Sequence, residues 1–144
     1  MKNVSNSLSE EQKLQLRQYV YNIVGCCQEV HRELGCYLNE YMYQDALEIA
    51  FHDAKIDCVR EFHFTTMFHG QKLHHEHQVD FLVKNHVFVE CKAVKELTSE
   101  NRQQLWNYMR LTDTRIGILF NFAPPIDQCE KYYFDPIKQT FSLF

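Results

Sequence analysis

The chain has 144 residues, of which 45% are hydrophobic and 14% aromatic, and its formal net charge at pH 7 is -4. This length is typical of a single domain, and the supply of core-forming side chains excludes an intrinsically disordered chain. Affinity for nucleic acid comes largely from neutralised phosphates, so an acidic chain excludes binding by overall charge, and any nucleic-acid site must be local.

The first predicted element is a long helix over residues 9–34. Its apolar side chains recur at nearly the helical period. Ser9, with Gln12 three residues later, matches a capping box at the start of this helix. The helix is expected to end near Gly35.

A second helix is predicted over about residues 39–55. Its alanine, leucine, isoleucine and tyrosine side chains define a broad apolar stripe, and Asn39 is a suitable N-cap. Glu40 then falls in the first turn of this helix.

The hydrophobic pattern next changes to the alternation that is typical of strands. Residues 58–68 and 73–83 are predicted to form a hairpin around a turn at 69–71, and residues 86–94 a third strand after a turn at 84–85. Three strands in quick succession predict an antiparallel meander.

The last third of the chain predicts a helix and further strands. A helix is expected over about residues 98–111, followed by an apolar strand over 115–122 that is covered on both faces. Residues 132–134 and 140–144 predict a small terminal hairpin, which either completes the sheet or pairs two subunits. The whole order predicts one domain over residues 1–144, with a mixed α+β architecture in which helices pack on the sheet.

Other features of the sequence concern the expected compartment. The chain has no apolar run of about 18 residues, and its start, MKNVSNSLSEEQK, lacks the apolar segment of a signal peptide. The six cysteines are scattered, without a CxxC pair, so we expect reduced thiols. These features predict a cytoplasmic protein with no membrane contact.

Two acids and a lysine stand among apolar residues on neighbouring predicted strands. Glu90 and Lys92 share one face of their strand, because side chains alternate between the faces. A tight turn near Asn85 places Asp80 across from Glu90, within reach of a cross-strand neighbour. We therefore expect two carboxylates and an ammonium group to converge.

Such a convergence favours a metal site. Buried carboxylates that approach each other are costly unless they are paired or bind a cation, and carboxylate oxygens suit Mg²⁺ or Mn²⁺. Lys92 could then orient the attacking water or stabilise the charge of a phosphorane. The arrangement suits phosphodiester hydrolysis, and the alternative is a structural ion pair across the hairpin.

The order of Asp80 and, ten positions later, Glu90-x-Lys92 resembles that of the PD-(D/E)xK nuclease superfamily. Further fragments over residues 20–123 resemble the small GxxExxY branch of this superfamily. These fragments are Leu34-Gly35, Leu38-x-Glu40-x-x-Tyr43-x-x-Ala46-Leu47, Asp80-Phe81-Leu82-Val83, Val89-Glu90-x-Lys92-Ala93, Gln104-Leu105-x-x-Tyr108-Met109 and Gly117-x-Leu119-x-Asn121-Phe122.

The resemblance implies a restriction-endonuclease-like αβββαβ core over about residues 20–123, with an extra N-terminal helix and a small C-terminal hairpin. It also implies an Mg²⁺-dependent (or Mn²⁺-dependent) nuclease, for which we expect DNA in preference to RNA as substrate. The implied metal ligands are Asp80, Glu90, the backbone carbonyl of Cys91, and Glu40. The implied catalytic residues are Asp80, Glu90, Lys92, Glu40 and Gln104.

The sequence departs from the branch at one place. Tyr37 stands where the family has its name-giving glycine, and Cys36 where a proline is common. The departure concerns the start of the second helix, and hence the placement of Glu40. Alternative functions are a catalytically inactive module that binds nucleic acid or a protein partner, and an accessory subunit; a homodimer also stays open.

Several of these residues also have a purely structural interpretation. Glu40 is favourable in a first helical turn without any metal, and Gln104 could be a solvated helix residue. Glu61 fits an exposed strand charge, and the tract His74–His77 fits a solvated patch better than a zinc site. Basic residues that could contact phosphates follow the acidic motif: Lys92, Lys95, Arg102 and Arg110.

Overall fold

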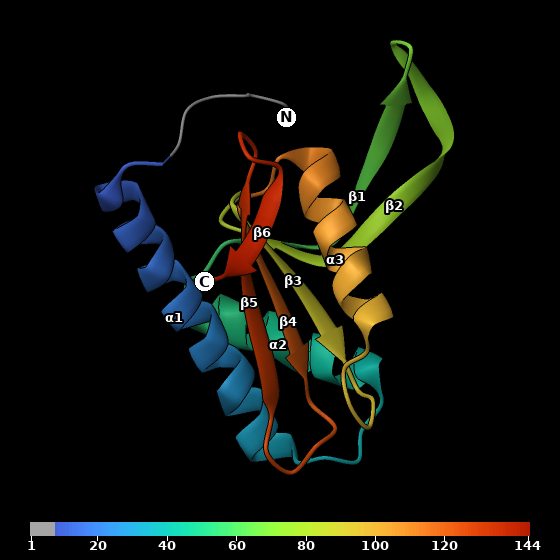
Figure 1. Cartoon of the computed structure of the whole chain (residues 1–144). Coiled ribbons are helices and arrows are strands. Elements are labelled where there is room, and N and C mark those ends of the chain that lie inside the picture. Colours follow the sequence, from blue (N-terminus) through green and yellow to red (C-terminus); the bar gives the residue numbers. More distant parts are fainter. Residues whose placement is uncertain (1–7) are drawn as a thin grey trace.

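A computed structural model describes residues 8–144 of the chain. Residues 1–7 lie outside this description. They begin the segment MKNVSNSLSEEQK, for which the sequence predicts no signal peptide. The described chain forms three helices and six strands in the predicted order (Figure 1). None of the helices in this part of the chain is long and apolar enough to cross a membrane.

Helix α1 (Glu10–Leu34) has the two predicted ends. The side chain of Ser9 accepts a hydrogen bond from the Gln12 backbone N–H, and the Gln12 side chain accepts one from the Ser9 N–H. This reciprocal capping satisfies two N–H groups that the first helical turn leaves unpaired. At the other end, Gly35 has a φ of 74°, in the region that favours glycine.

Helix α2 (Glu40–Asp53) also starts at the predicted cap. The Asn39 side chain accepts a hydrogen bond of 3.0 Å from the Met42 N–H. Tyr43 and Phe51 are fully buried on the side that faces the sheet. The helix ends two residues before the predicted boundary.

Strands β1 (Cys58–Phe68) and β2 (Gln71–Val83) form the predicted antiparallel hairpin. The turn contains only His69 and Gly70, whose φ angles are 50° and 75°. Positive φ at both central residues matches the turn that best fits the right-handed twist of two strands. Gln71, which was assigned to the turn, is the first residue of β2.

Strand β3 (Val87–Lys92) completes the predicted meander by pairing antiparallel to residues 81–83 of β2. It is shorter than the predicted 86–94. Helix α3 (Ser99–Thr112), capped by Thr98, then crosses over to strand β4 (Ile116–Asn121). The pairing of β3 with β4 is parallel.

Strands β5 (Gln128–Asp135) and β6 (Thr140–Leu143) form the C-terminal hairpin. Strand β5 is longer than predicted and pairs antiparallel with β4. The hairpin therefore completes a single mixed sheet with the strand order β1-β2-β3-β4-β5-β6.

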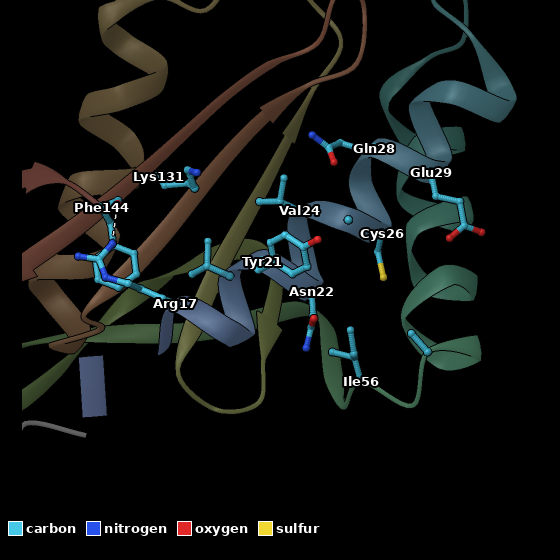
Figure 2. Close-up of a pocket in the computed structure, with 13 residues that line it drawn as sticks. Arg17, Tyr21, Asn22, Val24, Cys26, Gln28, Glu29, Ile56, Lys131 and Phe144 are labelled. Atoms are coloured by element: carbon cyan, nitrogen blue, oxygen red, sulfur yellow. Dashed lines mark hydrogen bonds between the residues drawn. The ribbon is translucent and has the colours of Figure 1, made fainter. Parts of the chain in front are cut away.

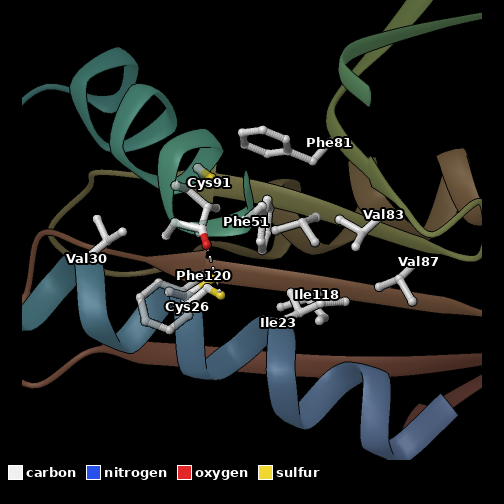
Figure 3. Close-up of a cluster of buried hydrophobic side chains, with 14 of the residues drawn as sticks. Ile23, Cys26, Val30, Phe51, Phe81, Val83, Val87, Cys91, Ile118 and Phe120 are labelled. Carbon is white, nitrogen blue, oxygen red and sulfur yellow. Dashed lines mark hydrogen bonds between the residues drawn. The ribbon is translucent and has the colours of Figure 1, made fainter. Parts of the chain in front are cut away.

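The sheet lies between two helical layers (Figure 1), with α1 and α2 on one face and α3 on the other. Figure 3 shows Ile23 of α1 and Phe51 of α2 packed with Ile118 and Phe120 of β4. All six residues of β4 are buried, as predicted for a strand covered on both faces. Each large apolar side chain removed from water contributes about 1.5–3 kcal/mol.

Candidate active site

The backbone pairing of β2 with β3 ends where the two strands separate. The last paired residues are Phe81 and Val89, and the register would place Asp80 opposite Glu90. Instead, the Asp80 N–H donates to Glu90 Oε1 at 3.0 Å, and the Cys91 N–H donates to Asp80 Oδ2 at 2.8 Å. One oxygen of each carboxylate thus accepts a hydrogen bond that a backbone carbonyl accepts in a regular pair of strands. The second oxygen of each carboxylate remains for another partner. We call this place, formed by Asp80, Glu90 and Cys91, the β2–β3 fork.

The ammonium group of Lys92 lies beside the fork. Its Nζ is 3.8 Å from Glu90 Oε2, and the Lys92 side chain is only 16% exposed. Glu90 and Lys92 lie on the α3 face of β3 together with Phe88, whereas Cys91 packs into the core on the α1–α2 face. The structure thus brings together the two carboxylates and the lysine that the sequence places in one site.

Burial dominates the electrostatics of the fork. Glu90 is 4% exposed, and burial and then the charge of Asp80 raise its pKa to about 8, against the lowering effect of Lys92. Burial also raises the pKa of Asp80, although the hydrogen bond from Cys91 and the charge of Lys92 lower it. Two poorly solvated carboxylates with one ammonium group form a site that a cation would stabilise.

Glu40 approaches this site from α2. Burial raises the pKa of the half-buried Glu40, the charge of Lys92 lowers it, and the charge of Asp80 raises it. The charge of Glu40 in turn contributes to raising the pKa of Glu90. The structure therefore brings Glu40 close enough for its charge to act on the fork.

The loop before α2 is held in place despite its departure from the family pattern. The Tyr43 hydroxyl donates a hydrogen bond to the Gly35 carbonyl and accepts one of 3.3 Å from the Leu38 N–H. The Tyr43 ring is stacked on Phe122 at a centroid distance of 4.6 Å. Tyr37 itself is 98% exposed. Tyr43 thus fixes the turn that leads to Glu40 without a glycine at position 37.

Helix α3, which covers the face of the sheet opposite α2, carries Gln104 and Tyr108. Gln104 is exposed, while Tyr108 is half-buried. Burial raises the pKa of Tyr108, the charges of Glu90 and Asp80 raise it further, and a hydrogen bond with Gln104 lowers it. Tyr108 stands in a fragment that resembles the family but is not among the site residues predicted from the sequence. The available signal was its position four residues after Gln104, which places both side chains on one helix face.

Comparison with known proteins identifies the family of the chain. The sequence model of the PD-(D/E)XK nuclease superfamily matches residues 5–132. This chain belongs to the PD-(D/E)XK nuclease superfamily. The superfamily is one of nucleases, and its members generally use divalent metals.

The fold agrees with this membership. The predicted αβββαβ core is confirmed as α2, β1, β2, β3, α3 and β4, with α1 as the extra N-terminal helix and β5–β6 as the C-terminal hairpin. A crystal structure of the protein SSO0001 is similar, with a TM-score of 0.51 and 18% sequence identity. The similarity covers 69% of this chain and 53% of SSO0001, so the chain spans about half of that protein. No match was found among curated proteins.

Three further residues that the sequence singles out lie on α3 and β1. Arg102 forms a two-pronged ion pair with Glu130 of β5, with distances of 2.7 and 2.8 Å, so its guanidinium is occupied. Arg110 is exposed and hydrogen-bonds to Asn107. Glu61 is exposed, and its charge contributes to raising the pKa of Asp80.

The fork fits the coordination habits of Mg²⁺ and Mn²⁺. Within residues 8–144, no three His, Cys, Asp and Glu side chains are arranged as a ready-made metal centre. Mg²⁺ commonly binds one or two carboxylates and completes its shell with waters and substrate phosphate oxygens. Two carboxylates that each keep a second oxygen meet this need.

A separate hollow lies along α1. It has a volume of about 790 Å³ and is lined mainly by α1, with Lys131 and Phe144 near Arg17 (Figure 2). Arg17 closes one end by donating to the Phe144 carbonyl at 2.9 Å. None of the predicted site residues lines this hollow.

Proposed function

We propose that this protein is a nuclease that hydrolyses phosphodiester bonds of DNA in a reaction that depends on Mg²⁺ or Mn²⁺ and takes place at the β2–β3 fork. The observation that carries the proposal is the approach of Asp80, Glu90 and Lys92 at the point where β2 leaves β3. We also propose that the chain belongs to the GxxExxY branch, and that residues 1–144 form one domain.

Asp80 and Glu90 would hold the metal with the carboxylate oxygens that accept no hydrogen bond from the backbone. The Cys91 carbonyl would be a third ligand, because the N–H and C=O of one strand residue point to the same side and the Cys91 N–H points to Asp80. Glu40 would complete the protein ligands from α2. A bound Mg²⁺ or Mn²⁺ supplies a positive charge that polarises the scissile phosphate and makes water more acidic.

Lys92 would act on the reacting phosphate. Its ammonium group stands beside Glu90 with little exposure to water, so its charge is poorly screened. In this position it can orient the attacking water and stabilise the negative charge that builds up on the phosphorane oxygens. Gln104, on the α3 side, would orient the water or a phosphate oxygen through its amide group.

The test of this proposal is cleavage of labelled single- and double-stranded DNA and RNA with Mg²⁺ or Mn²⁺. The wild type is compared with Lys92→Ala and Asp80→Asn, which we expect to lose at least about a hundredfold in rate, the order found when one charge-stabilising group is removed. Lys138→Ala is the matched control, because Lys138 is an exposed lysine in the turn between β5 and β6. It should keep wild-type activity.

The outcomes separate the proposed nuclease from an inactive relative. Metal-dependent cleavage that both variants lose and Lys138→Ala keeps would support the proposal. Cleavage of RNA alone would overturn the preference for DNA. No cleavage of any substrate, together with no heat of Mn²⁺ binding in calorimetry, would favour a catalytically inactive module that binds nucleic acid or a protein partner.

A further inference from the structure

The β1–β2 hairpin continues well beyond the fork. We define residues 62–79 as the hairpin arm; it projects away from the rest of the molecule (Figure 1). Residues 67–76 are all exposed, including the apolar side chains of Met67 (54%), Phe68 (59%) and Leu73 (46%). A two-stranded ribbon that nothing covers is only marginally stable in water, so its outer half is suited to a partner.

The chemistry of the arm suits a polyanion. Of the 19 acidic residues in the chain, the arm contains only Glu76, which lies 3.1 Å from the His63 ring. The arm also carries Lys72 and two glutamines. Five of the eight histidines of the chain lie here, namely His63, His69, His74, His75 and His77. The arm is thus rich in N–H donors and poor in acids, in a protein whose net charge is -4.

The base of the arm is fixed next to the fork. The Phe64 ring packs edge-on against Tyr108 of α3 at 5.2 Å and stacks with Phe88 of β3 at 6.0 Å. The His77 ring lies 5.4 Å from Tyr108. Asp80 follows the arm directly in β2, so the direction of the arm is set relative to the candidate metal ligands.

We propose that the hairpin arm is a DNA-binding ribbon that lies in the major groove of the duplex beside the scissile phosphate. The inference rests on the proposed function and specifies its substrate as double-stranded DNA. The major groove of B-DNA is wide enough for a two-stranded ribbon, whereas that of duplex RNA is deep and narrow. The N–H donors face acceptors on phosphates and base edges, and Phe68 suits contact with thymine methyl groups.

The length of the arm fits this assignment. From Asp80 to Gln71 the strand spans about 30 Å at its usual rise per residue, close to one turn of B-DNA. Between the pairs Thr65–Glu76 and Met67–Lys72, β2 contains two more residues than β1. Such a bulge increases the local bend and twist of a ribbon, which helps it to follow a groove.

The test shortens the arm and leaves its base intact. Residues 66–75 are replaced by Asn-Gly, which joins the paired Thr65 and Glu76 by a two-residue turn. Binding of labelled duplexes is measured by fluorescence anisotropy without divalent metal, which prevents cleavage. We expect the shortened protein to bind a duplex of about three turns at least about tenfold more weakly than the wild type, and both to bind a duplex of half a turn equally.

A point variant keeps the test valid if the shortened chain does not fold. Lys72→Gln should make the slope of log affinity against log salt shallower by about 0.9, the contribution of one phosphate contact. Lys138→Gln, at an exposed lysine in the β5–β6 turn, is the matched control and should leave the slope unchanged. Thermal unfolding of each variant verifies its fold.

The results separate the arm from the catalytic proposal. If both the shortened protein and Lys72→Gln bind the long duplex with wild-type affinity, the proposal that the arm is a DNA-binding ribbon is wrong, even if cleavage is intact. Equal losses on duplex RNA would overturn the assignment to the major groove of DNA. If binding of duplex DNA depends on the arm but the protein cleaves no substrate, the proposal for the arm stands and the proposed nuclease activity is wrong.

Discussion

At the fork, the two oxygens of each carboxylate have different roles. One oxygen of Asp80 and one of Glu90 accept backbone hydrogen bonds across the two strands. These bonds partly offset the free-energy cost of burying the carboxylates and hold the groups in place. The remaining oxygens are preorganised for a cation. The ammonium group of Lys92 lies 3.8 Å from Glu90 Oε2, and the charges of Lys92 and Arg60 both lower the pKa of Asp80.

The raised pKa of Glu90 predicts that the metal-free protein loses stability as the pH rises from about 4.5 to about 8. The folded state keeps this proton up to about pH 8, whereas the unfolded chain loses it near its ordinary pKa of 4.5. The folded state therefore binds more protons between these values, and its stability falls as pH rises through this window, by at most about 1.4 kcal/mol per pH unit. Glu90→Gln should remove this fall.

Urea unfolding with a chelator at pH 5 and pH 8 measures the effect. The wild type should lose more stability between the two values than Glu90→Gln does. Glu33→Gln, at an exposed position of α1, should behave like the wild type. Identical pH profiles for the wild type and Glu90→Gln would contradict a buried, protonated Glu90.

The role of the Tyr43 hydroxyl group in holding the loop before α2 can be tested by removing its oxygen atom. Tyr43→Phe leaves the Gly35 carbonyl and the Leu38 N–H without their hydroxyl partner. We expect a loss of about 1 kcal/mol in the free energy of unfolding. Cleavage should also slow, because the loop that leads to Glu40 loosens. Tyr41→Phe, at a side chain that is 69% exposed, is the control in urea unfolding and cleavage assays; equal effects would contradict this role.

At the scale of elements, the contact of α3 with β4 depends on Gly117. A Cβ atom at this position would lie 2.5 Å from Met109 Sδ and 3.1 Å from two carbons of Leu105. Gly117→Ala should therefore push α3 outward and destabilise the fold by about 1–3 kcal/mol. Because α3 carries Gln104, the rate of cleavage should fall as well.

Gly25→Ala in α1 is the matched control for this prediction. A Cβ atom at Gly25 has no neighbour within 4 Å, and alanine is the better helix former by about 0.5–1 kcal/mol. Chemical denaturation should show Gly117→Ala as less stable and Gly25→Ala as equally or more stable than the wild type. Equal stability of the two variants would mean that α3 and β4 are not closely packed.

Local signals in the sequence determine most elements and part of the site. The caps Ser9 and Asn39 and the His69-Gly70 turn mark element boundaries, because each satisfies a requirement of its own backbone. Alternation along β3 and the turn before it are enough to bring Asp80, Glu90 and Lys92 together. The separation of β2 from β3 beyond Phe81 has no local signal in the sequence, and β3 continues to pair with β4 there.

Contacts between layers could not be predicted in the same way. The charge of Glu40 reaches the fork because α2 docks on one face of the sheet, and Tyr108 reaches it because α3 docks on the other. Docking is decided by side chains that are far apart in the sequence. The pairing of Arg102 with Glu130 likewise joins residues 28 positions apart, and sequence spacing alone left Arg102 as a candidate for phosphate contact.

At the scale of the whole molecule, the proposed metal links β2 and β3 with α2, so its binding should stabilise the entire fold. A ligand that binds only the folded state at a hundred times its dissociation constant adds about 2.7 kcal/mol. For a chain of this length, this corresponds to a rise of about 5–10 °C in Tm. Thermal unfolding with Mn²⁺ should show this rise in the wild type, and a chelator should reverse it. The double variant Asp80→Asn, Glu90→Gln should show no rise; an equal rise in both proteins would place the bound metal away from the fork.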